Sequence, residues 1–172
     1  MAKNDTPRLQ ARQLLDRLGI QTAPTPVEKI ARMLTAQVRF SPLDDELSGM
    51  IYIKDGVPII GVNSLHHPHR QRFTIAHELG HLQLHRDMIE SEVHVDKDFP
   101  VLLRDQNSAS GTEKVEIQAN DFAAELLMPE ALIQQALAGK RFDIDDDAPI
   151  EELAKKFRVS KQALEYRIRK FR

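Results

Sequence analysis

The sequence contains no cysteine. Disulfide bonds and thiolate metal ligands are therefore excluded, and any zinc site has to be built from histidine and carboxylate side chains. Nitrogen and oxygen ligands of that kind favour a catalytic zinc site over a structural one.

Long apolar segments are also missing. No run of 18 apolar residues occurs, and residues 1–7 are polar, without the apolar core of a signal peptide. We therefore expect a soluble, cytoplasmic protein with no membrane partner. A chain of 172 residues is long enough to bury one core around a cleft, so we expect one domain with a small appendage.

The charge is distributed unevenly along the chain. The net charge is −2, but residues 150–172 carry eight Lys or Arg against three Glu, whereas residues 1–149 sum to −7. A basic end of this kind is either a solvated helix face or a nucleic-acid contact.

The segment that carries chemistry is His77-Glu78-Leu79-Gly80-His81. On a helix, two histidines four residues apart project from one face and can bind one metal ion. Glu78 would lie beside the open coordination position, where a carboxylate can take a proton from water. Pro68 suits a first helical turn, and apolar residues recur at helical spacing, which predicts a helix over residues 68–84. The alternative is an exposed histidine pair without a metal.

A catalytic zinc site needs a third protein ligand. Glu116 and Asn120 lie one turn apart on a second predicted helix, so Glu116 can bind the metal while Asn120 orients a histidine. Two other carboxylates compete with Glu116. Glu113 lies in the first turn, where the helix dipole favours a negative charge, and Glu125 lies well around the helix from Glu116.

The other elements predict an α+β fold. Strands are expected over residues 37–40, 49–54 and 57–62, and the turn Asp55-Gly56 predicts a hairpin between the last two. We expect a small antiparallel sheet packed directly on the metal helix, with an edge that could receive an extended peptide. Residues 89–111 are predicted to be mostly loop with one strand over 99–103, forming one wall of the cleft.

Five further helices and three caps are expected. Gly19 should end the first helix, which should bury Leu9, Leu14, Leu15 and Leu18. Thr25, Thr112 and Ser160 are candidate N-caps. The helices, including that of Glu116, are predicted over residues 8–18, 26–34, 113–127, 129–138, 150–157 and 160–171.

Two segments carry a resemblance to a known family: RQRFTIAHELGH at residues 70–81 and EIQANDFAAELLMP at residues 116–129. Together with Ser48-Gly49, Val62-Asn63 and Arg104-Asp105, they occur in the order typical of the ImmA/IrrE family of metallo-endopeptidases. The sequence resembles this family over roughly residues 10–170.

The resemblance implies a zincin-like, gluzincin-type metalloprotease fold. It implies that His77, His81 and Glu116 bind Zn²⁺ and that Glu78 is the catalytic base, although Mn²⁺ or Fe²⁺ suits the same ligands. It also implies a bacterial or phage regulatory protease that cleaves a helix-turn-helix repressor of the XRE type. The competing hypothesis is a metal-containing transcriptional regulator, or a module that binds a toxin or antitoxin partner without proteolysis.

The sequence does not decide which residue stabilises the transition state. The donor that stabilises the transition state could be His85 or Tyr52, or else His94 or an arginine. A structural zinc site would be closed by a fourth protein ligand, and no residue is visibly placed for that purpose.

The C-terminal segment reads as an appendage. We divide the chain into a zinc metallopeptidase domain, residues 1–148, and a helix-turn-helix-like segment, residues 149–172. The second helix of this segment could contact DNA through Lys161, Gln162, Arg167 and Arg169. The alternative is that the segment docks on the peptidase domain or on the repressor, and we prefer it because one short motif without a dimerisation element binds DNA weakly.

Overall fold

A computed structural model of the chain describes residues 6–97, 111–139 and 147–171. The predicted strand over residues 99–103 and nearly all of the acidic linker before residue 148 lie outside the described residues. Among the described helices, none is long and apolar enough to cross a membrane.

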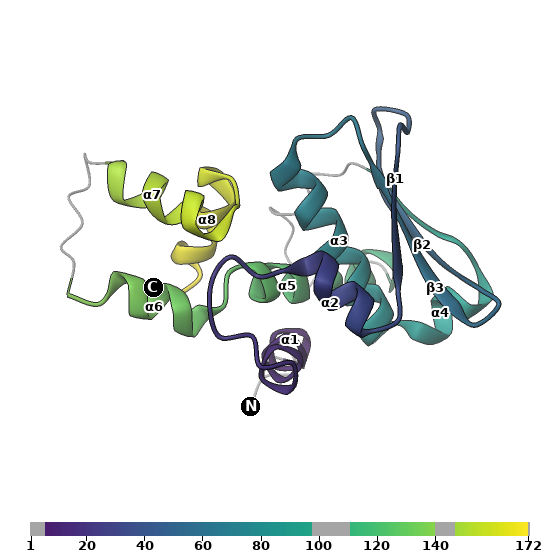
Figure 1. Cartoon of the computed structure of the whole chain (residues 1–172), viewed down its shortest axis with the longest axis horizontal. Helices are drawn as coiled ribbons and strands as arrows, with labels where there is room; N and C mark the ends of the chain where they lie inside the picture. Colours follow the sequence, from purple (N-terminus) through teal and green to yellow (C-terminus); the bar gives the residue numbers. More distant parts are fainter. Residues whose placement is uncertain (1–5, 98–110, 140–146, 172) are drawn as a thin grey trace.

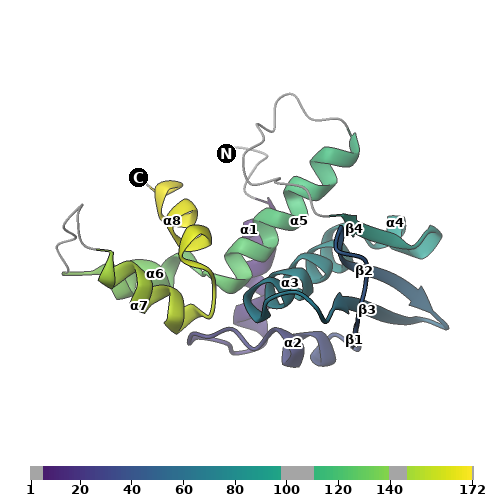
Figure 2. The same cartoon turned by 90° about the horizontal axis from the view of Figure 1, so that it is seen from above.

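The fold is built around helix α3 (Pro68–Leu84), whose bounds match the predicted helix. Pro68 occupies its first turn, and the ring of His67 caps it by accepting a hydrogen bond from the backbone N–H of His69. Every residue from Thr74 to Leu82 is buried. The reason is visible in Figures 1 and 2, where α3 lies between the sheet and helix α5 (Gly111–Leu127).

The sheet has four strands in the order β1-β3-β2-β4. Its members are β1 (Gln37–Ser41), β2 (Leu47–Lys54), β3 (Val57–Asn63) and β4 (His94–Lys97). The predicted hairpin between β2 and β3 is confirmed. Asp55 and Gly56 have φ angles of 51° and 77°, and a two-residue turn that matches the twist of the strands requires positive φ at both positions.

The prediction of an entirely antiparallel sheet was wrong, because β1 pairs with β3 in parallel. Strand β3 lies between β1 and β2, so the connection from β1 to β2 crosses the end of β3. The buried side chain of Asn63 holds this crossing: its amide donates to the carbonyl oxygen of Leu47 at 2.9 Å and its oxygen accepts from the backbone N–H of Leu43 at 3.2 Å. A turn signal reveals which strands are joined, but not which strand inserts between them.

The stretch that follows α3 was also mispredicted. Within the predicted loop, the structure has a short helix α4 (Arg86–Ser91) and the edge strand β4, which pairs with β2 in antiparallel orientation. The alternation Val93-His94-Val95-Asp96 is the period-two signal that could have indicated this strand.

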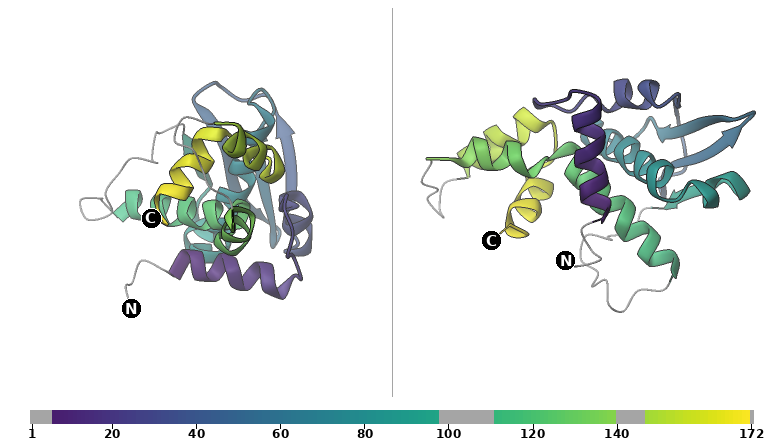
Figure 3. Two further views of the ribbon diagram at one scale, coloured as in Figure 1. Left: turned by 90° about the vertical axis from the view of Figure 1, so that its left-hand side faces the viewer. Right: turned by 90° about the horizontal axis from the view of Figure 1, so that it is seen from below.

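The N-terminal helices are α1 (Thr6–Arg17) and α2 (Val27–Met33). The right-hand view of Figure 3 shows α1 lying across α5. Helix α1 buries Ala11, Leu14 and Leu15, whereas Leu9 is 49% exposed and was wrongly assigned to the buried stripe. Thr25 does not cap α2; its buried hydroxyl donates to the carbonyl oxygen of Leu126 at 2.8 Å and so ties the start of α2 to the end of α5.

Three helices follow α5 in the chain: α6 (Glu130–Leu137), α7 (Ala148–Phe157) and α8 (Lys161–Arg169). They lie at the end of the molecule opposite the sheet in Figure 1. Ser160 caps α8 as predicted, by accepting from the backbone N–H of Ala163 at 3.1 Å. Thr112 lies inside the first turn of α5 and is not its cap.

Two glycines allow close packing on either side of α3. A Cβ atom on Gly80 would lie 3.0 Å from the backbone oxygen of Ala119 on α5, and one on Gly49 would lie 2.4 Å from Cγ2 of Thr74. Because both gaps are too small for a methyl group, the sheet and α5 can approach α3 only where glycine is present.

Candidate metal centre

The two motif histidines point the same way from α3. The Nε2 atoms of His77 and His81 are 3.0 Å apart, and both side chains are buried. This is the pairing expected for residues four apart on one helical face.

Helix α5 brings the third side chain. Oε2 of Glu116 lies 3.1 Å from Nε2 of His77, and Oε1 lies 3.4 Å from Nε2 of His81. Glu125, one of the competing carboxylates, lies elsewhere and forms a buried ion pair with Arg167. Among the described residues, Glu113 belongs to neither cluster of side chains that could hold a metal ion. The fold therefore joins His77, His81 and Glu116.

Neighbouring side chains orient both imidazoles. Nδ1 of His77 lies 2.9 Å from Oδ1 of Asn120, and because an amide oxygen only accepts, this ring nitrogen must carry the proton. Nε2 of His77 is then left with its lone pair free for a metal.

His81 is oriented by a longer relay. Nε2 of His85 lies 2.9 Å from Oε1 of Gln118 and must donate to it, so Nδ1 of His85 accepts from Nδ1 of His81 at 3.1 Å. Nε2 of His81 therefore also faces the centre as an acceptor. The sequence did not suggest Gln118, because an exposed glutamine on a helix carries no signal by itself.

The residues present fit a bound cation. Acceptor atoms of two imidazoles and one carboxylate converge within 3.4 Å of one another, and such a set is stable only around a positive charge. Burial alone would lower the pKa of His77, but the hydrogen bond to Glu116 and the nearby acidic groups raise it to about 9. Burial lowers the pKa of His81 to about 3. Without a metal, the cluster thus takes up one proton in its place.

Glu78 lies beside this cluster and is completely buried. Among the described residues, neither of its carboxylate oxygens has a hydrogen-bond partner, and burial raises its pKa well above the usual value for glutamate. It forms a second group of possible metal ligands with His77 and Asp96. A buried carboxylate without hydrogen bonds is poised to exchange a proton.

The structure gives two predicted stabilisers, His85 and Tyr52, positions outside the ligand cluster. His85 contacts His81 through Nδ1, on the side of the ring away from Glu116, where it orients the histidine. Gly49 of β2 faces α3, and since side chains alternate along a strand, Tyr52 on the same strand points to the opposite face of the sheet.

Strand β4 adds two side chains that the sequence did not single out as ligands. Nε2 of His94 lies 2.9 Å from Oε1 of Glu116, and the rings of His81 and His94 are 4.1 Å apart between centroids. Asp96, two residues further on, lies within 4.8 Å of His77 and Glu78. A fourth possible ligand is therefore present, contrary to the expectation that none is placed for it.

Comparison with known proteins decides the family. A family model of M78 peptidases, described as the IrrE N-terminal-like domain, matches residues 31–169. The chain belongs to this family. The resemblance inferred from the two motif segments is confirmed.

Two known proteins similar to this IrrE-like chain are much longer than it is. The radiation response metalloprotease IrrE of Deinococcus radiodurans is 37% identical over 110 residues, which are 63% of this chain and 30% of that protein. The structure of a Mycobacterium tuberculosis transcriptional regulator superposes with a TM-score of 0.64 and 21% identity, over 94% of this chain and 45% of the other. At that identity the likeness shows a shared α+β fold.

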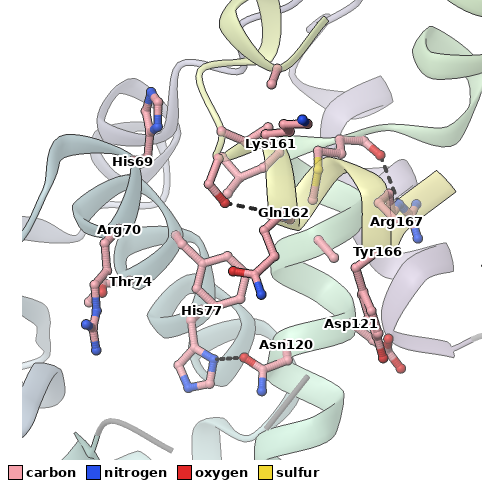
Figure 4. Close-up of a pocket in the computed structure, with 18 of the residues that line it drawn as sticks. His69, Arg70, Thr74, His77, Asn120, Asp121, Lys161, Gln162, Tyr166 and Arg167 are labelled. Carbon is pink, nitrogen blue, oxygen red and sulfur yellow. Dashed lines mark hydrogen bonds between the residues drawn. The ribbon is translucent and has the colours of Figure 1, made fainter. Parts of the chain in front are cut away.

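A cleft of about 920 Å³ begins at the candidate metal centre of this IrrE-like chain. His77, Glu116 and Asn120 line one end, and Gln162 and Tyr166 of α8 line the other. Figure 4 shows the Gln162 side chain pointing into the cleft on the side of His77. The C-terminal helices therefore form a wall of the cleft that leads to the candidate metal centre.

Helix α8 is held in place by buried polar contacts. Arg167 forms an ion pair with Glu125 in which both side chains are at most 2% exposed, and its Nε donates to the backbone oxygen of Met128 at 3.2 Å. At the surface, outside this buried group, Lys161 pairs with Asp147. Two of the four residues predicted for DNA contact are thus engaged within the chain, and the suggestion of Arg167 as a DNA contact was wrong because its guanidinium is buried.

Proposed function

We propose that this chain is a metal-dependent endopeptidase with a zincin-like fold, in which His77, His81 and Glu116 hold the metal and Glu78 is the catalytic base. The observation that supports this most is the convergence of three ligand atoms beside a buried carboxylate, at one end of a large cleft. Zinc suits two imidazoles and a carboxylate, and Mn²⁺ or Fe²⁺ can use the same ligands.

The residues of the chain supply the proton transfers. When bound, zinc polarises a peptide carbonyl and makes water a better nucleophile. A nearby cation also opposes the effect of burial on Glu78 and lowers the pKa of this carboxyl, so that it can act as a base. Glu78 then accepts a proton from the attacking water and donates it to the nitrogen of the leaving amine. Asn120 and His85 keep the two imidazoles oriented throughout.

We propose that the substrate is a protein, a helix-turn-helix repressor of the XRE type, whose cleavage relieves repression. The cleft of about 920 Å³ has room for a polypeptide segment, and α8 presents Gln162, Tyr166 and Lys170 along it. In this proposal the C-terminal segment recognises the substrate and does not bind DNA, because its basic residues Lys161 and Arg167 already have carboxylate partners.

The test is the replacement of Glu78 by glutamine. The zinc-loaded protein and the Glu78→Gln variant are incubated with XRE-type repressors, beginning with one encoded beside the gene for this chain, and fragments are identified by mass spectrometry. Glu78→Gln should retain the metal and the fold but lose cleavage by at least about a hundredfold, as expected for loss of a general base. Glu92→Gln, at an exposed position after α4, is the matched control and should cleave normally.

A second function is favoured by one observation, the presence of His94 at the metal cluster. Four protein ligands are typical of a structural zinc site, so the chain could instead be a metal-containing regulator that binds a repressor, or a toxin or antitoxin partner, without cutting it. Release of a repressor from its operator by Glu78→Gln at the wild-type level, with no fragments, would establish this second function and refute the first.

A further inference from the structure

The position of His94 relative to Glu116 suggests direct binding to the metal. Ligands about 2.0–2.1 Å from a tetrahedral zinc ion are about 3.3 Å from one another. The Nε2 atom of His94 is 2.9 Å from Oε1 of Glu116, and the other ligand pairs in the cluster span 3.0–3.4 Å. His94 therefore lies at the distance of a fourth tetrahedral ligand.

A role in stabilising the transition state would require a different position. A donor to an oxyanion lies about 2.8 Å beyond that oxygen, which itself occupies the fourth coordination position. Such a donor would be separated from the protein ligands by the oxygen atom between them. One ring nitrogen of His94 instead lies within 4.8 Å of the ligand atoms of His77, His81 and Glu116. Its Nε2 is 2.9 Å from Oε1 of Glu116, so it lies among the ligand atoms rather than beyond them.

The edge strand also covers the catalytic carboxylate. His94 and Asp96 are two residues apart on β4, so both point inward, whereas Val95 between them is 39% exposed. Asp96 lies near His77 and Glu78, and Glu78 has no exposed surface. Strand β4 thus occupies the fourth ligand position and limits access to the base at the same time.

We propose that His94 is a fourth protein ligand that closes the metal site in the resting protein, and that the peptidase works only after His94 leaves the metal. Within the described part of the chain, strand β4 spans four residues and pairs with β2 alone. An edge strand of this length is held by few backbone hydrogen bonds, so an arriving extended substrate can displace it. This inference rests on the proposed function, because only an enzyme needs its fourth position opened.

The ligand count can be measured without any activity. X-ray absorption of the zinc-loaded full chain should show three imidazole ligands in the wild type and two in His94→Ala, with a water oxygen in place of the third. His69→Ala, which removes a histidine at the start of α3 that belongs to neither group of possible ligands, is the control and should retain three. Two imidazoles in the wild type would overturn the proposal.

The closure can be measured with cobalt and azide. Azide should leave the visible spectrum of the Co²⁺-loaded wild type unchanged, because no coordination position is free, and should change that of His94→Ala. A wild-type spectrum that responds to azide as strongly as His94→Ala would refute closure. Zinc affinity of His94→Ala should fall about tenfold or more, since loss of even an outer contact costs that much.

Cleavage assays distinguish a failure of this inference from a failure of the proposed function. Per bound zinc, His94→Ala should cleave at least as fast as the wild type, because its site is already open. A variant with unchanged metal spectra and slower cleavage would show that His94 acts on the substrate, which refutes this inference and leaves the peptidase intact. If neither protein cleaves while the spectra differ as expected, the peptidase proposal fails and His94 is a ligand of a structural site.

Discussion

Gly80 lies at a close approach between α3 and α5, and replacing it tests how the site is assembled. In Gly80→Ala the new methyl group would lie 3.0 Å from the backbone oxygen of Ala119, 3.1 Å from its Cα and 3.3 Å from Cβ of Phe122. Backbone atoms cannot rotate away, so α5 has to move outward by a few tenths of an ångström. Glu116 is less than one turn from Ala119 and must move with the helix.

The energies of this change oppose each other. Alanine improves helix propensity over glycine by about 0.8–1 kcal/mol, whereas overpacking a tight contact costs about 1–3 kcal/mol. We therefore expect a net loss of unfolding free energy of about 1 kcal/mol. A shift of Glu116 beyond about 0.2 Å also exceeds the tolerance of a metal–ligand distance, so zinc affinity should fall about tenfold.

Chemical denaturation of the metal-free protein and competition with a chromophoric zinc chelator measure the two effects separately. Gly111→Ala is the control, because a Cβ atom at that position of the same helix would meet none of the described residues within 4 Å. It should leave zinc affinity unchanged and stability equal or slightly higher. A Gly80→Ala protein that is more stable than the wild type and binds zinc normally would refute the idea that this contact positions Glu116.

Three further predictions concern the ligands and the C-terminal helix. Glu116→Gln should weaken zinc binding far more than Glu113→Gln in a chelator competition, because a neutral amide is a poor ligand; equal losses would mean that another carboxylate binds. Arg167→Ala should lower the unfolding free energy measured in urea by about 3 kcal/mol, since it leaves the buried carboxylate of Glu125 without its main partner. Its control, Arg169→Ala at an exposed position, should change the unfolding free energy by about 0.5 kcal/mol at most. Zinc binding at pH 7.5 should release at least about one proton, because the pKa of His77 is raised to about 9 without metal and burial also raises the pKa of Glu78, so affinity should rise about tenfold or more per pH unit up to pH 9. Calorimetry in buffers of different ionisation enthalpy checks this, and an enthalpy that does not depend on the buffer would contradict it.

The sequence by itself was enough to predict the features that depend only on residues close together along the chain. The bounds of α3, the Asp55-Gly56 turn and the Ser160 cap follow from local rules of helix periodicity, backbone angles and capping. The spacing of His77 and His81 likewise fixes their common direction, since four residues make nearly one helical turn.

Contacts between distant segments were decided by the tertiary structure alone. Glu116 and Glu125 both lie on α5, and the packing of that helix turns one toward the histidines and the other toward Arg167. The parallel pairing of β1 and the arrival of His94 at the cluster depend on how strands are ordered in the sheet. Local propensity carries no information about which strand lies beside which, because that choice minimises the free energy of the whole packed chain.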